Sequence, residues 1–154
     1  MLFITDVQSF IIPVILISAG LLYVERKRGA ALILSAVIIL TVNDFLSHHI
    51  LKELFARPRP CHVLELLKGI AHCTQSFSFP SSHASNIFTL ATLASLCHKN
   101  TALLAIMVAL MVSFSRVYLG LHYPTDIIGG AICGIGMGFL GHKLYQRLQK
   151  VLIR

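Results

Sequence analysis

The sequence predicts an all-α integral membrane protein: a polytopic bundle of about five transmembrane helices with a short outer-side loop or interfacial helix. Composition is the first observation behind this prediction. Of 154 residues, 56% are hydrophobic and only 12% are charged, and the mean hydropathy is +0.79. Soluble domains carry about 25% charged residues. The second observation is that the apolar residues fall into stretches close to the roughly 20 residues that a helix needs to cross a membrane.

Five apolar segments are candidates for membrane spans. The basic run Arg26-Lys27-Arg28 separates the first segment from the second. The third segment begins after Pro80 and is the shortest. The fifth begins at Pro124, a residue favoured in the first turn of a helix. We expect spans over residues 2–24, 30–51, 82–97, 101–117 and 124–145, and we expect residues 1–154 to form a single integral membrane domain.

The distribution of Lys and Arg predicts the orientation of these spans. With the N-terminus outside, eight of the 13 basic residues lie on the cytoplasmic side, where such residues are enriched. The net charge of +7 does not indicate a nucleic-acid partner, because the basic residues are spread over short loops and form no continuous stripe. We therefore expect a multi-pass protein of the bacterial cytoplasmic membrane, with its outer loops facing the periplasm or the exterior.

The largest segment outside the membrane runs from residue 52 to residue 80. Its stretch 62–72 is patterned as a short amphipathic helix on the membrane surface, although an ordinary connecting loop explains the pattern equally well. Cys61 and Cys73 lie in this segment, on a side of the membrane where disulfides persist. We expect a Cys61–Cys73 bridge, which stabilises the fold by roughly 3 kcal/mol; two free thiols are the alternative.

Three polar motifs stand at the ends of apolar segments, all on the predicted outer side. They are Lys52 with Arg59-Pro60, then Pro80-Ser81-Ser82-His83, then Ser115-Arg116 with His122 and Asp126. Positioned cations stabilise the charge that builds up on a transferring phosphoryl group. The predicted start of a helix at Ser81 adds free backbone N–H groups, which bind anions. The sequence therefore predicts a phosphate-binding site.

The two histidines divide the catalytic work in this hypothesis, since one attacks phosphorus and the other protonates the leaving oxygen. Asp126 follows His122 by four residues across a helix start, so its carboxylate can reach the imidazole and fix the tautomer. His83 is then the natural acid. Each residue taken singly also has an ordinary structural explanation, such as a lysine reaching for the membrane surface at Lys52 or a helix-dipole partner at Asp126.

Together the motifs resemble the signature of the type-2 phosphatidic acid phosphatase family. The spacing of Lys52 to Arg59-Pro60 and that of Ser115-Arg116 to His122 and Asp126 match the pattern, while Ser82 stands where the family has glycine. The resemblance implies His122 as the nucleophile that forms a phosphohistidine, Asp126 as its orienting partner and His83 as acid and then base. It assigns the phosphate to Lys52, Arg59, Ser81, Ser82 and Arg116. Membrane members commonly have six spans, so this chain resembles a small version without the first.

The resemblance implies an enzyme that removes a terminal phosphate from a lipid phosphate or diphosphate at the outer leaflet. We expect no metal or other cofactor, because Asp126 is the only acid within a motif. The nature of the lipid is left open. A phosphotransferase of the same family and a non-catalytic lipid-binding membrane protein are the two alternatives.

Two further patterns concern the helices themselves. Asp44, His48 and Lys52 recur every four residues and so share one helix face. Asp44 then either pairs with His48 or supports Lys52, or it lies at a wet interface with little effect. Glycines 130, 134 and 138 form a stripe of small residues that favours close packing against another span of the same chain. We expect a monomer or a weak dimer.

Overall fold

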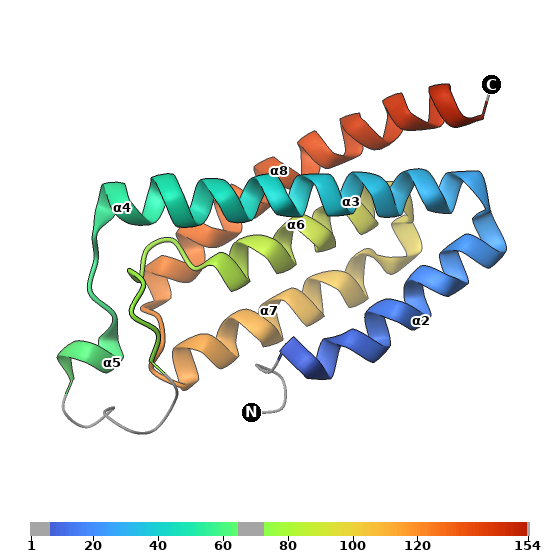
Figure 1. Ribbon diagram of the computed structural model, residues 1–154. Helices are drawn as coiled ribbons and strands as arrows, with labels where there is room; N and C mark the ends of the chain where they lie inside the picture. The colour runs from blue at the N-terminus through green and yellow to red at the C-terminus, as the bar shows by residue number, and fades with distance from the viewer. Residues whose placement is uncertain (1–6, 65–72, 154) are drawn as a thin grey trace.

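The computed structural model describes residues 7–64 and 73–153, and the side chains from residue 12 onward within them. Its elements are α2 (Val7–Glu25), α3 (Lys27–Leu46), the π-helical turn η1 (Ser47–Leu51), α4 (Lys52–Phe55), α5 (Pro60–Val63), α6 (Ser82–Cys97), the 3-10 turn η3 (Lys99–Thr101), α7 (Ala102–Tyr118) and α8 (Pro124–Leu152). All secondary structure over these ranges is helical, which confirms the predicted all-α class (Figure 1).

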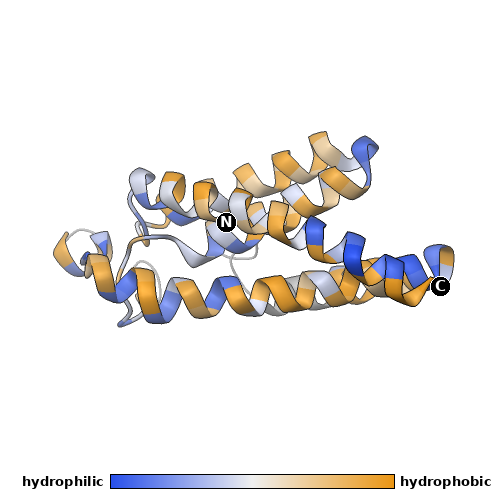
Figure 2. Ribbon diagram, turned by 90° about the horizontal axis from the view of Figure 1, so that it is seen from above, coloured by the Kyte–Doolittle hydropathy of each residue, from blue (hydrophilic) through white to orange (hydrophobic). Residues whose placement is uncertain are grey.

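Three helices in the described ranges are long and apolar enough to cross a membrane. They are Lys27–Phe55, Lys99–Tyr118 and Pro124–Leu152, and a shorter apolar helix covers Ile12–Glu25. The bundle is apolar on its outside: Leu103, Leu104 and Ile132 are 73%, 65% and 67% exposed. Figure 2 shows hydrophobic residues along the helices and hydrophilic residues gathered toward their ends. This distribution fits a bundle surrounded by lipid.

The 16-residue α6 lies inside the bundle, where it contacts α8, α7 and α3. The predicted glycine stripe of α8 faces it. A Cβ atom at Gly130 or Gly134 would collide with the backbone of Ser81 or Ser85, and one at Gly138 would collide with Thr92. The stripe therefore packs within the chain, as expected, and it sets the close approach of α6 to α8.

Some boundaries differ from the expected ones. The final helix continues for seven residues beyond the predicted end at residue 145, because its polar last turns still form helix after the apolar pattern stops. The second predicted span passes through η1 and ends at Phe55, not at residue 51. The predicted surface helix over 62–72 falls largely on residues 65–72, outside the described residues; a short helix, α5, precedes it at Pro60–Val63.

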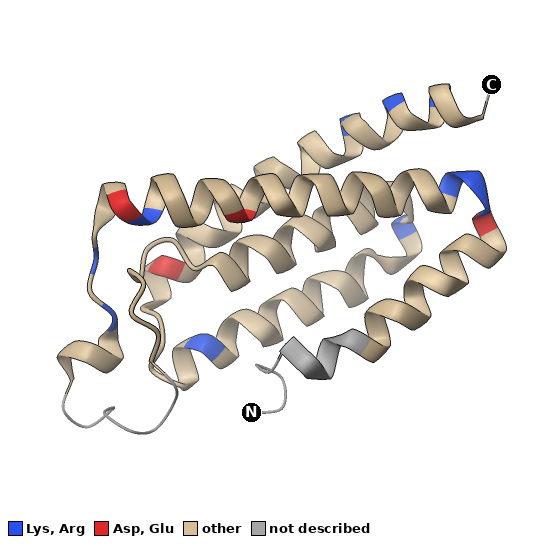
Figure 3. Ribbon diagram, viewed as in Figure 1, with Lys and Arg blue, Asp and Glu red and all other residues tan. Residues whose placement is uncertain are grey.

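Charged residues gather at the two ends of the bundle, with few along its length (Figure 3). At one end, the segment after α4 carries Arg57 and Arg59 and leads into α5. Cys61 of α5 forms a disulfide with Cys73, which confirms the predicted bridge. The bridge joins the start of the loop to the segment that leads into α6, and both segments contribute to the site described next.

Candidate active site

Four segments meet at one end of the bundle: the end of α4, the segment that leads into α6, the turn after α7 and the start of α8 (Figure 1). At this end lies a cavity of about 300 Å³, lined from η1, the start of α4, the segment before α5, the segment that leads into α6, the start of α6, the end of α7 and the turn after it. Its volume is near the lower end of the range of about 300–1,000 Å³ for small-ligand sites. Its lining residues are His48, Lys52, Arg59, Thr74, Ser76, Ser82, His83, Arg116, Leu121 and His122.

The imidazole of His122 is buried at 4% exposure between a carboxylate and a guanidinium. Its Nδ1 lies 3.5 Å from Oδ2 of Asp126, and its Nε2 lies 3.3 Å from Nη1 of Arg59. A guanidinium can only donate hydrogen bonds, so Nε2 is the acceptor and Nδ1 carries the proton. In this tautomer the lone pair of Nε2, a possible nucleophile, faces the Arg59 guanidinium at the cavity wall.

The carboxylate of Asp126 is fully buried and is held from several directions. Arg57 Nη1 donates to Oδ1 at 2.8 Å, the backbone N–H of Tyr123 donates to Oδ2 at 2.8 Å, and Ser78 Oγ also donates to Oδ2. Arg57 is itself stacked over the Tyr123 ring, 4.0 Å from its centroid. These contacts fix the carboxylate in an orientation that faces Nδ1 of His122.

Arg59 is anchored by the segment that leads into α6. Its Nε donates to the carbonyl of Ser76 at 2.7 Å and its Nη2 to the Ser76 hydroxyl at 2.9 Å, while Nη1 also reaches the carbonyl of Leu121 at 3.3 Å. Burial lowers the pKa of the Arg59 guanidinium, and the nearby charge of Asp126 opposes this shift. Arginine nevertheless stays protonated, so the cavity keeps this positive charge.

Two further cations and a serine complete the polar wall. Lys52 and Arg116 are buried at 3% and 7% exposure, and both line the cavity. Ser82 also lines it, and its buried hydroxyl has no hydrogen-bond partner within residues 7–64 and 73–153. A buried hydroxyl without a partner is costly, so its position at the cavity wall is explained if a ligand supplies the missing bond.

The N-termini of α6 and α8 lie side by side at the cavity. Ser81 is the N-cap of α6, since its hydroxyl accepts a hydrogen bond from the backbone N–H of Ala84 at 3.4 Å. Its own N–H donates to the carbonyl of Asp126 at 3.1 Å, which ties the two helix starts together. Pro124 occupies the first turn of α8, as expected. Two positive helix ends therefore add to the cationic character of this end of the bundle.

The charge state of His122 suits a nucleophile. Burial lowers its pKa, and the hydrogen bond and charge of Asp126 only partly oppose this shift. Because the ordinary value is about 6.5, the ring is neutral at neutral pH. His83 differs from His122: its side chain is exposed, and it lines the cavity from the first turn of α6.

The structure brings all eight predicted catalytic and phosphate-binding residues to this end of the bundle. Six of them line the cavity: Lys52, Arg59, Ser82, His83, Arg116 and His122. Asp126 lies behind His122, and Ser81 caps α6 without lining the cavity. Sequence reasoning missed Arg57 and Ser78. Arg57 lies 69 residues and Ser78 lies 48 residues before Asp126, which both side chains contact. No local spacing could reveal contacts over such separations.

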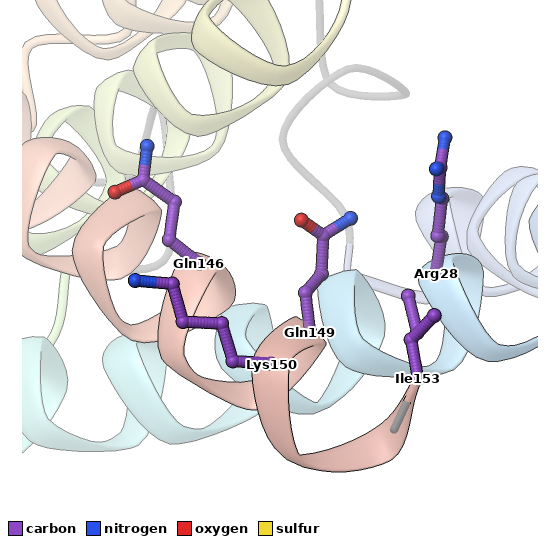
Figure 4. Close-up of a pocket in the computed structure, with 5 residues that line it drawn as sticks. All are labelled: Arg28, Gln146, Gln149, Lys150 and Ile153. Carbon is purple, nitrogen blue, oxygen red and sulfur yellow. The ribbon is translucent and has the colours of Figure 1, made fainter.

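A second, more open cavity lies between the start of α3 and the end of α8. Arg28, Gln146, Gln149, Lys150 and Ile153 line it (Figure 4). It contains none of the motif residues and no histidine. Motif residues line the other cavity, which is therefore the candidate active site.

Comparison with known proteins identifies related sequences over most of the chain. The sequence profile described as the PAP2 superfamily matches residues 29–150. YbjG of Escherichia coli, provisionally named an undecaprenyl-diphosphatase, is 39% identical over 129 residues, which are 77% of this chain and 63% of that protein. Lipid A 4'-phosphatase of Bacteroides thetaiotaomicron is 32% identical over 149 residues, 85% of this chain and 65% of that protein. The chain thus spans slightly less than two thirds of each.

A solved structure shares the fold. It is described as a transmembrane PAP2 type phosphatidylglycerolphosphate phosphatase from Bacillus subtilis, and it matches with a TM-score of 0.63 and 27% sequence identity. The match covers 90% of this chain and 70% of that one.

Proposed function

Because this chain belongs to the PAP2 superfamily and is a multi-pass membrane protein, we propose that it is a phosphatase that removes a terminal phosphate from a lipid phosphate or diphosphate. The observation that carries this proposal is the buried His122 ring, held between Asp126 and Arg59 at the wall of a cavity that is also lined by Lys52 and Arg116. Residues 1–154 act as one integral membrane phosphatase domain in this proposal.

In the first step, Nε2 of His122 attacks phosphorus and forms a P–N bond. The bond from phosphorus to the leaving oxygen breaks, its electron pair stays on that oxygen, and His83 donates a proton to it. Lys52, Arg59 and Arg116, with Ser82 and the α6 start capped by Ser81, bind the phosphoryl oxygens. Asp126 stabilises the positive charge that develops on the imidazole, because its carboxylate accepts the Nδ1 proton in a hydrogen bond.

In the second step, His83, now neutral, removes a proton from a water molecule that attacks the phosphohistidine. The P–N bond breaks, its electron pair returns to Nε2 of His122, and inorganic phosphate leaves. His83 has regained its proton and His122 its lone pair, so the cycle closes. The cations and helix ends supply the charge stabilisation in both steps, so we propose that turnover requires no metal.

The substrate is proposed to be a lipid that carries its phosphate at the membrane surface. Relatives are named for undecaprenyl diphosphate, lipid A 4'-phosphate and phosphatidylglycerophosphate, and all of these place a phosphate beside an apolar tail. The apolar outside of the bundle is suited to such tails. The distribution of basic residues favours an active site at the outer leaflet of the bacterial cytoplasmic membrane.

The decisive experiment is phosphate release by the purified chain from a panel of lipid phosphates and diphosphates. His122→Ala should abolish turnover, because it removes the attacking atom, while His49→Gln should leave it unchanged, because His49 is exposed and does not line the cavity. Vanadate should inhibit the unmodified enzyme competitively and should not bind His122→Ala. Full activity of His122→Ala would contradict this mechanism. Loss of activity in EDTA that is restored by a divalent metal would also contradict it.

The same assay separates the two alternatives. A phosphotransferase of this family would pass the labelled phosphate to a second lipid, so the label would appear in lipid and not in free phosphate. A non-catalytic lipid-binding protein would release no phosphate, and His122→Ala would have no effect on its lipid binding.

A further inference from the structure

A chain of polar groups lies between α3 and α6, beside the candidate active site, and the proposed mechanism does not use it. Asn43 is 2% exposed; its amide donates to Oδ1 of Asn86 at 2.5 Å and its carbonyl accepts from Ser85 Oγ at 2.8 Å. Asn86 in turn donates to Oδ1 of Asp44 at 3.2 Å. The same Asp44 oxygen lies 3.8 Å from Nε2 of His48. The network therefore runs from the bundle interior to His48.

His48 is the member of this network that reaches the cavity. It lies in η1, the π-helical turn between α3 and α4, and it lines the cavity together with Lys52 and His83. Isolated π-helical turns inside longer helices frequently occur at functional sites. The His48 side chain is 41% exposed, whereas Lys52 is 3% exposed. His48 thus forms the outer rim of the cavity and Lys52 its inner wall.

The position of Asp44 within a membrane helix calls for a structural or functional explanation. A carboxylate in a membrane helix is costly and marks a functional residue by default, and this one is 51% exposed on the outside of the bundle. Asn86 fixes it from α6, so it is held beside His48. Asp44 and a bound anion would together favour the doubly protonated imidazole, in which one N–H faces Asp44 at 3.8 Å and the other is available to the anion. The arrangement is suited to hold a negatively charged group at the rim.

The position of the rim relative to the catalytic groups identifies which part of a substrate it meets. The phosphate that is transferred must contact His122, which lies at the buried wall with Arg59 and Arg116. The lipid tail must leave through the exposed side. The group between them is the one that stays on the lipid. In a lipid diphosphate that group is a second, charged phosphate; in a lipid monophosphate it is a neutral ester oxygen.

We propose that Asp44 and His48 form a specificity element for lipid diphosphates: His48 binds the phosphate that remains on the lipid, and Asp44 positions His48. This inference rests on the proposed function and names the substrate class of the same site.

The test compares two substrates that differ only in the retained phosphate, such as farnesyl diphosphate and farnesyl monophosphate. We expect His48→Gln to lower the ratio of kcat/KM for the diphosphate to kcat/KM for the monophosphate by about 10-fold or more, since a hydrogen bond to a charged group is lost. Asp44→Asn should lower the ratio in the same direction, and His48→Arg should restore it. His49→Gln, the matched control, should leave both rates unchanged.

An equal loss with both substrates in His48→Gln would show a merely structural role and would overturn the inference while the proposed function stands. A thermal-shift experiment needs no turnover. Farnesyl methylenediphosphonate should stabilise the unmodified chain more than farnesyl phosphonate does, and His48→Gln should lose this difference. If the unmodified chain releases no phosphate from either substrate, the proposed function fails, and the thermal shifts alone decide the role of His48.

Discussion

His122 and Asp126 show how individual side chains set the chemistry of the candidate site. The carboxylate of Asp126 has no exposed surface, and contacts from the α4–α5 segment, the segment before α6 and the start of α8 hold it in place. The ring of His122 has one nitrogen facing this carboxylate and the other facing Arg59. The direction of its lone pair is therefore set by neighbours that come from different helices.

The lowered pKa of His122 predicts a pH profile. Burial lowers the pKa, so the neutral, nucleophilic ring persists to a lower pH than that of a free histidine. Activity should be retained as the pH falls through about 6.5 and be lost only below it, when the ring takes up a proton. Asp126→Asn removes the charge that raises this pKa, so the residual activity should show its acid limb at still lower pH. The measurement is kcat/KM against pH; an acid limb above the ordinary histidine value would contradict the prediction.

Ser82 gives a second prediction at the scale of one residue. Its buried hydroxyl lacks a partner within the described ranges and lines the cavity, so we expect it to donate to a phosphate oxygen. Ser82→Ala should weaken vanadate inhibition by about 10-fold, the effect of losing one hydrogen bond to a charged ligand. Ser113 offers the control, because its hydroxyl is also buried without a described partner but does not line the cavity. Equal inhibition constants for Ser82→Ala and Ser113→Ala would contradict this role.

At the scale of helices, the contact between α6 and α8 determines the geometry of the site. His83 is at the start of one helix and Asp126 at the start of the other, and the glycine stripe lets the two backbones approach closely. A shift of α8 along α6 would separate the Ser81 N–H from the Asp126 carbonyl. The packing of these helices therefore helps to position the candidate site, although no glycine of the stripe lines the cavity.

Two glycines of α8 provide a matched test of this packing. A Cβ at Gly134 would collide with the Ser85 backbone and with Phe88, whereas a Cβ at Gly136 would meet nothing within 4 Å. Gly134→Ala should destabilise the protein by about 1–3 kcal/mol, the usual effect of overpacking, and should lower activity. Gly136→Ala should be neutral or stabilise by up to about 1 kcal/mol, because alanine favours helix. Thermal unfolding in detergent measures both; similar melting temperatures for the two variants would show that the contact is not tight.

The elements differ in how far the sequence could predict them. The bounds of α6 match the expected span, because Ser81 and Pro80 give a clear start signal and the apolar pattern stops at Cys97. The π-helical turn η1 could not be predicted, since one extra residue in a turn leaves no mark on hydropathy. Hydropathy also fails to predict the end of α8 at Leu152, because the polar residues after residue 145 form helix as readily as apolar ones. The contacts of Arg57 and Ser78 with Asp126 depend on tertiary structure, so the sequence alone does not reveal them.

The disulfide ties α5 to the segment that leads into α6. It joins Cys61 to Cys73, close to Arg59 on one side and Ser76 on the other, which are hydrogen-bonded to each other. Replacing both cysteines by serine should lower the free energy of unfolding by roughly 3 kcal/mol, the value for a loop of this order of length. The melting temperature should fall, whereas kcat measured at low temperature should change little. Alkylation with and without reductant provides the check, because ready labelling of both thiols without reductant would contradict the bridge.

The orientation of the whole molecule can be tested with introduced cysteines in a variant whose free Cys97 and Cys133 are replaced by serine. Gln75→Cys lies at the end of the bundle that carries the candidate site, and Lys150→Cys lies near the other end. The charge distribution predicts that a membrane-impermeant thiol reagent labels the cysteine at position 75 in intact cells and does not label the one at position 150. The reverse pattern would place the site in the cytoplasm.

The length of α8 has a consequence for how the protein sits in its lipid environment. It has 29 residues, and at a rise of 1.5 Å per residue it is roughly 44 Å long, longer than the hydrocarbon thickness of about 30 Å. Its first turn holds Asp126, and its last turns carry Lys143, Arg147 and Lys150, long basic side chains of the kind that extend to a headgroup layer. The length of α8 therefore fixes the distance between its basic last turns and the candidate site at its first turn. We therefore expect bilayer thickness to influence the depth of the candidate site relative to the headgroup layer.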